Sequence, residues 1–329
     1  MAMIRRVNLA TVLCALRILA EAQGNSTPLA DVRKAAEQGD AGSQFNLGLM
    51  YSKGQGVIKN YAEALGWYRK AADQGYANAQ FNLGVMYDQG HGVPKDYAEA
   101  VRWYRMAADQ GDAGARFQLG AMYYEGHGVR QDCAEAVRWY RKAVEQGNDR
   151  GPFQLAEIYF DGCPGVPQNY AEAALWYRKV ADQGDPYAKW RLGTMYSLGQ
   201  GVPQDYARAI RLFRELAKND EVDAYTSLGE AHEEGKGVPQ DYAEALRWYL
   251  MAADEGWSLA QFNLGRMYAQ GHGVPQDYVR AHMWVNLAGS GSDTELQKKA
   301  SEERDRLAAK MTPQQIAAAQ QLAREWKRK

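Results

Sequence analysis

The chain has 329 residues, of which 39 are basic and 40 acidic, and its formal net charge at pH 7 is -1. Proteins that bind nucleic acid usually carry a basic excess, so this balance argues against a nucleic-acid partner. The three cysteines exclude a disulfide-dense fold, and no stretch approaches the roughly 18 apolar residues of a membrane-spanning helix.

Residues 1–22 predict a secretory signal peptide or, as the alternative, an N-terminal capping helix. Arg5 and Arg6 precede a mostly apolar stretch at 7–16, and the small-residue sequence Ala-Glu-Ala at 20–22 offers a cleavage site. Arg17 weakens this signal because the apolar run before it is short. We therefore expect a periplasmic or secreted protein, with a cytoplasmic protein as the alternative.

A predicted linker at residues 23–26 leads to Thr27 and Pro28, which supply a helix N-cap and a first-turn proline. Residues 33–39 then match residues 69–75, one period later. The match predicts an isolated second helix that covers the first complete repeat.

A Leu-Gly pair recurs along the chain at intervals of 36 or 37 residues. A period in this range is typical of a solenoid, in which each unit buries its apolar face against its neighbours. The sequence therefore predicts seven tandem units, marked by Leu47-Gly48, Leu83-Gly84, Leu119-Gly120, Leu155-Ala156, Leu192-Gly193, Leu228-Gly229 and Leu264-Gly265.

Each unit predicts two helices, which we call helix A and helix B. In the second unit, small and apolar residues fall on one side of helix A, which ends at Gly90 because glycine adopts the left-handed conformation at low cost. Asp96 and Glu99 form a predicted capping box that opens helix B. Nothing alternates with a period of two, so we expect no strands. The helix A positions are Ala79, Leu83, Gly84 and Tyr87.

Small residues predict where the two helices of a unit approach each other. Gly84 on helix A and Ala100 on helix B would allow a close approach, while Tyr87 and Trp103 would fill the wider gaps between units. The unit marked by Leu192-Gly193 diverges most from this pattern, with Leu212-Phe213 in place of Trp-Tyr. We interpret that divergence as drift, a bend or a contact point.

These units resemble Sel1-like repeats, which are relatives of the tetratricopeptide repeat. The resemblance rests on Ala…Leu-Gly…Tyr in helix A, the Gly-x-Gly-Val-Pro loop, and Asp-Tyr…Ala…Trp-Tyr…Ala-Ala…Gly in helix B, over roughly residues 31–290. It implies an all-α fold, an α/α superhelical solenoid with helix A on the concave side. Family members are adaptors that hold other proteins together, so we expect residues 23–290 to form such a solenoid.

Residues 291–329 leave the repeat pattern and predict two capping helices. Ser292 or Asp293 would start the first, and Thr312 with Gln315 forms a predicted capping box at the start of the second. Both helices are rich in Glu, Gln, Lys and Arg, and a polar outer face is what the end of a solenoid needs.

The sequence predicts no enzyme and no catalytic, cofactor-binding or metal-binding residues. Neither Ser-x-x-Lys nor Gly-x-Ser-x-Gly occurs, which removes the commonest serine acyl-transfer signatures. A cell-wall-related hydrolase of β-lactamase-like type, or a binder of peptidoglycan peptides, is the alternative function, because some cysteine-rich Sel1-like proteins have been described in those terms.

Histidines and cysteines in the loops leave two smaller questions. His91 and His127 occupy equivalent loop positions and make a poor metal site without a third ligand, so we expect solvated loops. Cys133 and Cys163 would lie close enough to form a disulfide in an exported protein, with free thiols as the alternative.

The face of helix A opposite the core stripe is the predicted binding surface. An aromatic row that includes Phe45 and Phe81 either packs between neighbouring A helices or lines a groove, whereas the other positions on this face vary from unit to unit. The pattern favours a protein or peptide partner that offers a basic and apolar segment. The candidate partner-binding residues are Asp88, Tyr124, Glu157, Phe160, Trp190, Glu230 and Glu233.

Overall fold

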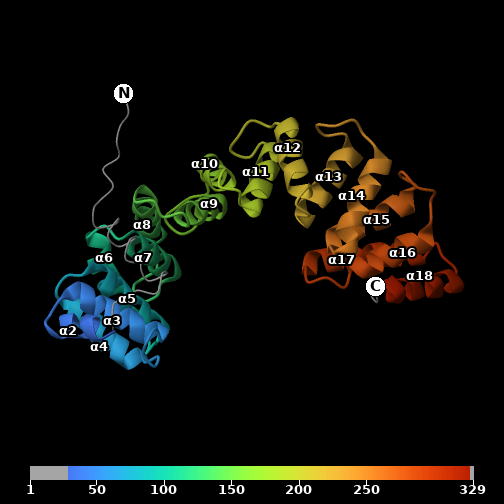
Figure 1. Cartoon of the computed structure of the whole chain (residues 1–329). Coiled ribbons are helices and arrows are strands. Elements are labelled where there is room, and N and C mark those ends of the chain that lie inside the picture. Colours follow the sequence, from blue (N-terminus) through green and yellow to red (C-terminus); the bar gives the residue numbers. More distant parts are fainter. Residues whose placement is uncertain (1–28, 327–329) are drawn as a thin grey trace. The chain divides into compact units, whose positions relative to one another are not determined.

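The computed structural model describes residues 29–326, and within that range every regular element is an α-helix (Figure 1). The predicted N-terminal segment, with its Thr27 and Pro28 cap, lies outside the described residues. The helices are α2 (Leu29–Glu37), α3 (Ala41–Lys53), α4 (Tyr61–Asp73), α5 (Ala77–Gln89), α6 (Tyr97–Asp109), α7 (Ala113–Glu125), α8 (Cys133–Glu145), α9 (Gly151–Asp161), α10 (Tyr170–Ala181), α11 (Pro186–Leu198), α12 (Tyr206–Ala217), α13 (Val222–Glu234), α14 (Tyr242–Asp254), α15 (Ser258–Gln270), α16 (Tyr278–Ala288), α17 (Thr294–Ala308) and α18 (Pro313–Trp326).

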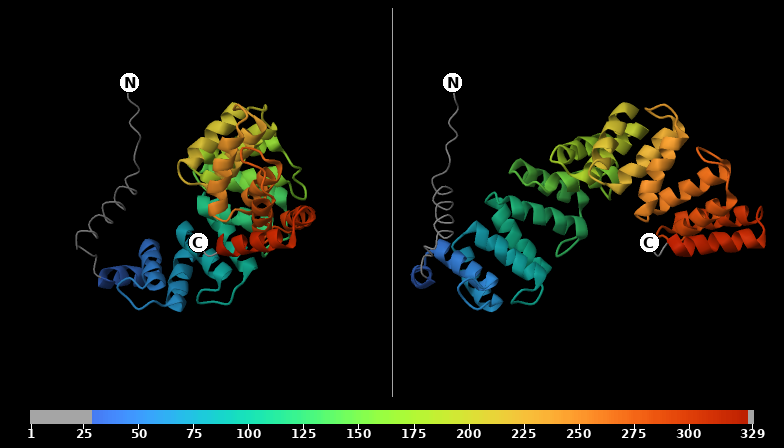
Figure 2. Two further views of the ribbon diagram at one scale, coloured as in Figure 1. Left: turned by 90° about the vertical axis from the view of Figure 1, so that its right-hand side faces the viewer. Right: turned by 45° about the vertical axis from the view of Figure 1, so that its right-hand side comes forward.

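The helices form seven consecutive pairs, which confirms the predicted all-α repeat fold. The odd-numbered helices from α3 to α15 are the A helices, and the even-numbered ones from α4 to α16 are the B helices. An A helix such as α5 packs against α6 of its own repeat and also against α4 of the repeat before it. Both views in Figure 2 show this stacking within α13–α16.

The chain divides into two compact units. The first comprises the described residues up to Leu155 together with Cys163–Pro167, and the second comprises Ala156–Gly162 together with the described residues from Gln168 onward. The division falls within α9, in the fourth repeat. That repeat carries Ala156 where the other A helices have glycine.

The ends of the helices follow the predicted signals, except for half of the capping box. Gly90 ends α5 in the left-handed conformation, with φ at 74°. The Asp96 carboxylate accepts hydrogen bonds from the backbone N–H groups of Ala98 and Glu99. The other half of the predicted box, a bond from the Asp96 N–H to the Glu99 side chain, is not formed. The Asp96 N–H instead donates to the Tyr87 carbonyl at 2.9 Å.

The second predicted capping box, at the start of α18, is complete. Thr312 N–H donates to Gln315 Oε1 at 2.8 Å, and Gln315 N–H donates to Thr312 Oγ1 at 3.3 Å. Before α17, the Asp293 side chain accepts from the N–H groups of Glu295 and Leu296. Both C-terminal helices pack on α16, where the rings of Trp284 and Trp326 meet edge to face at 4.7 Å.

In four A helices the glycine receives a tyrosine ring from helix B, a contact that differs from the prediction; the four glycines are Gly48, Gly84, Gly120 and Gly229. A methyl group placed on Gly84 would lie 2.5 Å from two ring atoms of Tyr104, the buried aromatic residue of α6. Ala100 is buried as well, but it is not what Gly84 meets. The predicted close approach is therefore one of a helix to an aromatic ring rather than of two helix backbones.

The histidines of the Gly-His-Gly loops at 91 and 127 are partly exposed, and their rings also pack on the preceding repeat. The His91 ring stacks on Tyr61, the first residue of α4, with centroids 4.5 Å apart. Gly92 has φ at 71°, and a Cβ there would lie 2.6 Å from the Tyr61 backbone. Only glycine permits so close an approach with this backbone conformation.

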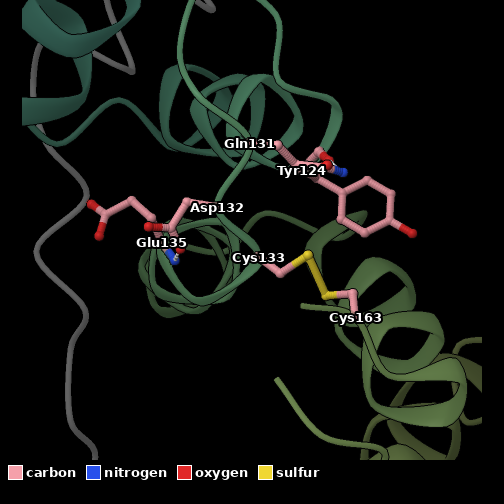
Figure 3. Close-up of a disulfide and its surroundings, with 6 residues drawn as sticks. All are labelled: Tyr124, Gln131, Asp132, Cys133, Glu135 and Cys163. Atoms are coloured by element: carbon pink, nitrogen blue, oxygen red, sulfur yellow. Dashed lines mark hydrogen bonds between the residues drawn. A yellow bond between two sulfur atoms is a disulfide. The ribbon is translucent and has the colours of Figure 1, made fainter. Parts of the chain in front are cut away.

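A disulfide joins Cys133, the first residue of α8, to Cys163 in the loop after α9 (Figure 3). The two Cα atoms are 6.3 Å apart, within the range that a disulfide spans. The N–H of Cys163 also donates to the Val166 carbonyl, which closes a tight turn around the second cysteine. This pairing answers the question that the sequence left open.

We expect Gly84→Ala to lower the free energy of unfolding by about 1–3 kcal/mol, because the new methyl group would overlap the Tyr104 ring. Gly66→Ala is the matched control, since Gly66 lies in α4 and a Cβ there meets nothing within 4 Å. Its higher helix propensity should raise the free energy of unfolding by up to about 1 kcal/mol. Urea unfolding measures both, and equal effects of the two substitutions would contradict the ring contact.

Removing the disulfide should also destabilise the protein. The bridge closes a loop with a sequence separation of 30, for which the loss of unfolded-state entropy corresponds to roughly 3–4 kcal/mol. Thermal unfolding of a Cys133→Ser, Cys163→Ser double variant should therefore match that of the reduced protein, below that of the oxidised protein. Identical melting of oxidised and reduced protein would mean that the bridge carries no stability.

Candidate functional site

Buried tyrosines from the B helices lie among polar and charged side chains of the A helices. We call these residues the tyrosine row, and each sits between the A helix of its own repeat and the A helix of the next. The Tyr104 hydroxyl, for example, accepts a hydrogen bond from Gln118 of α7 at 3.5 Å and faces Asp88 of α5. The row consists of Tyr68, Tyr104, Tyr140, Tyr177 and Tyr249.

Two of the predicted site residues, Asp88 and Tyr124, belong to the first unit. Burial, together with the Asp88 carboxylate, raises the pKa of Tyr104 and keeps its hydroxyl protonated. Tyr124 ends α7 with 37% of its surface exposed, near the disulfide (Figure 3). Its hydroxyl is one of the groups that raise the pKa of Tyr140, after burial and Glu125.

Three predicted residues of the second unit gather around an arginine that the sequence analysis missed. The Arg191 guanidinium lies 4.4 Å from the centre of the Phe160 ring and 5.7 Å from that of Trp190. Arg191 Nε also donates to the Tyr187 hydroxyl at 2.7 Å. The Tyr177 hydroxyl donates to Glu157, so this carboxylate is held next to the same cation.

The remaining two predicted residues lie on α13. Glu233 has only 11% of its side chain exposed, and its carboxylate accepts from the Tyr249 hydroxyl at 2.8 Å and from Arg266 at 3.2 Å. Glu230 is solvent-exposed and has no such partner among the described residues. Surrounding protein first, and then the charges of Glu234 and Glu233, raise the pKa of Glu230.

Much of the aromatic row packs against the tyrosine row of the same repeats. The Phe81 ring meets Tyr104 at 5.8 Å, and Phe117 meets Tyr140 at 5.4 Å. Phe45 likewise contacts Tyr68. These rings pack against the tyrosine row, whereas Phe160 and Trp190 contact the Arg191 guanidinium and remain partly exposed.

The sequence analysis missed the tyrosine row and Arg191. Each of these tyrosines was read only as one of the large residues of the helix B stripe. Arg191 stands at a position where other A helices carry Asn82, Gln118 or Gln154. A charged residue at a position where these other repeats carry amides was the available signal of a functional residue. Arg191 lies at the centre of the group formed by Glu157, Phe160 and Trp190.

Two further properties of the described residues concern metal binding and membrane insertion. The described residues hold no group of three or more His, Cys, Asp and Glu side chains arranged to bind a metal ion. Across residues 29–326, none of the helices has the length and apolar character needed to cross a membrane.

Comparison with protein-family models matches the Sel1 repeat to seven segments that together make up well over half of the chain. They begin and end close to the helix pairs described above. The matched residues are 41–76, 77–112, 113–148, 153–185, 186–221, 222–257 and 258–293.

Two solved structures are similar over most of the chain. A Sel1 repeat protein from Oxalobacter formigenes is 35% identical, with a TM-score of 0.59, and the match covers 83% of this chain and 79% of that one. A protective antigen of uropathogenic Escherichia coli that displays an SLR fold is 31% identical, with a TM-score of 0.51, and the match covers 90% and 85%. The search of curated proteins gives no match.

Glu230 and Glu233 of α13 should respond oppositely to neutralisation. Because the pKa of Glu230 is raised from 4.5, the folded protein holds this proton more tightly than the unfolded chain, and stability is lost as the pH rises through that region. Glu230→Gln should therefore raise the unfolding midpoint at about pH 7 and change little at about pH 4. Glu233→Gln removes an acceptor for Tyr249 and Arg266 and should lower the midpoint at about pH 7. Loss of stability in both variants would contradict this account.

Proposed function

The chain belongs to the Sel1 repeat family, and we propose that it is a non-enzymatic scaffold that binds a protein or peptide partner along its helix A surface. Sel1 repeat proteins are repeat scaffolds that generally mediate protein–protein interactions. The family relation supports the general role, and the residues on the helix A surface support the choice of binding face.

The observation that carries the proposal is how residue types change from repeat to repeat. At the packing positions nearly every repeat carries the same residues, such as Leu-Gly. On the helix A surface, the position of Glu157 is instead Val85 in one repeat and Ala121 in another. Stacking therefore places no demand on this position, which leaves it free for recognition of a partner.

The chemistry of this surface favours a partner segment with basic and apolar residues. In the second unit, Phe160 and Trp190 offer aromatic surface that remains half exposed. Glu230 and Glu234 add carboxylates on α13, and the pKa of Glu230 is raised first by the surrounding protein and then by repulsion from the charges of Glu234 and Glu233. A bound lysine or arginine would relieve that repulsion, whereas an acidic segment would increase it.

The disulfide supports a location outside the reducing cytoplasm. Structural disulfides persist in the periplasm and in secreted proteins, and they are rare where thiols are kept reduced. Together with the signal predicted in residues 1–22, the Cys133–Cys163 bridge favours a periplasmic or secreted scaffold over a cytoplasmic one.

Binding of labelled peptides of about 12 residues that combine lysine and leucine tests the proposal. We expect these peptides to bind, and a Trp190→Ala, Glu230→Lys double variant to weaken binding by about tenfold, because it removes an aromatic contact and reverses a charge. Fluorescence anisotropy at constant salt measures the affinity, and circular dichroism checks that the variant is folded.

Glu302→Lys is the control for charge. Glu302 is exposed on α17, away from the A helices, and its substitution changes the net charge by the same amount as Glu230→Lys. This variant should bind like the unaltered protein. An equal loss of affinity in the control would reduce the binding to general charge attraction, and turnover of a β-lactam or a muropeptide would favour the hydrolase alternative.

A further inference from the structure

The exposed side of α12, in the fifth repeat, carries a hollow of about 390 Å³ on the face of helix B rather than of helix A. Its walls are α12 and the loop between α13 and α14. The loop is pressed against α12 at Gly237, where a Cβ would lie 2.6 Å from the Cβ of Tyr206. Ile210, which is buried, and Val238 form an apolar floor.

Three cations line this hollow, which we call the α12 groove. Arg211, Arg214 and Lys218 are exposed, and among the described residues none of them makes an ion pair or a side-chain hydrogen bond. They stand at i, i+3 and i+7, so they lie along one face of the helix over about 10 Å. Glu215 is the one acid in the lining, and its nearest cationic partner is Lys189, at 3.9 Å.

The other repeats show how unusual the free Arg211 is. Its counterpart Arg102 in α6 pairs with Glu99 at 3.4 Å, and the counterpart Arg247 in α14 pairs with Glu244 at 3.1 Å. In α12 the residue three positions earlier is Arg208 instead of a glutamate, and it pairs with Asp205. Arg211 is therefore left without the carboxylate that holds its counterparts.

Lys218 reverses the charge at a second position. The equivalent residue is acidic in five other B helices, as Asp73, Asp109, Glu145, Asp182 and Asp254. The repeat fold is therefore compatible with an acid at this position, and stacking does not demand the lysine. Two positions of α12, Arg208 and Lys218, thus carry a positive charge where other B helices carry an acid. Among the described residues, the α12 groove is the one place where a B helix presents a cluster of unpaired cations, and it has an apolar floor.

We propose that the α12 groove is a docking site for an acidic segment of a partner protein, one that carries carboxylates at helical spacing together with an aliphatic side chain. Carboxylates at i, i+3 and i+7 of such a segment would match the three cations, and the aliphatic group would cover Ile210 and Val238. An apolar floor between walls favours a peptide over a single phosphate, which would use only one end of the hollow. This surface is separate from the helix A surface and attracts the opposite charge.

The test uses the full-length protein and a labelled acidic peptide with glutamates at helical spacing and leucines between them. We expect binding that weakens with added salt. An Arg211→Gln, Lys218→Asp double variant should bind on the order of tenfold more weakly, because each lost surface pair contributes about threefold to fivefold. The aspartate at 218 restores the charge type of the other repeats, so the variant should fold, and circular dichroism verifies this.

Lys298→Asp is the matched control. Lys298 is exposed on α17 and, within the part of the chain that the structure describes, makes no ion pair. Its substitution changes the net charge by the same amount as Lys218→Asp and should leave acidic-peptide binding unchanged. An equal loss in the control, the absence of peptide binding, full competition by inorganic phosphate, or preferential binding to phosphatidylglycerol vesicles would each overturn the proposal. If Lys218→Asp lowered the unfolding midpoint and left binding intact, the lysine would be only a helix cap.

Discussion

In four of the seven repeats, a contact between a tyrosine ring and a glycine joins helix B to helix A. The glycine removes the side chain from one point on helix A, and the ring of helix B rests at that point, as Tyr104 does on Gly84. Such packing buries a large aromatic residue without leaving a void. The same contact places the buried hydroxyl beside Asp88 and Gln118, so one residue both joins the helices and positions side chains of the A helices. In the fifth repeat Phe213 keeps the packing and loses the hydroxyl.

The periodicity of the sequence was sufficient to predict the helices, the repeat number and most of the turns. It was not sufficient for contacts that depend on side-chain direction. The pairing of Gly84 with Tyr104 rather than Ala100 depends on a rotamer, which spacing alone does not reveal. The Asp96 box failed in one half because the donor it needed is used by the Tyr87 carbonyl of the preceding helix, a contact made across the turn.

The candidate site was also predicted from the sequence only in part. Glu157, Phe160 and Trp190 were identifiable because they vary where the packing residues do not, and they do lie near one another. The cation that joins them, Arg191, and the hydroxyl groups that hold the carboxylates come from positions that appeared to be structural. Charge on the second unit is accordingly arranged by face: carboxylates among aromatic rings on the A helices, and unpaired cations over an apolar floor on α12. A scaffold with two such faces is able to hold two partners of opposite charge at once.

The disulfide has a further consequence when the chain is under mechanical tension. When a solenoid is pulled from its ends, its helices extend and the chain lengthens. The residues between Cys133 and Cys163 are bypassed by the covalent bond. Under load this segment, which contains all of α8 and α9, would add no length, so the two repeats that share the bridge would extend less than the others.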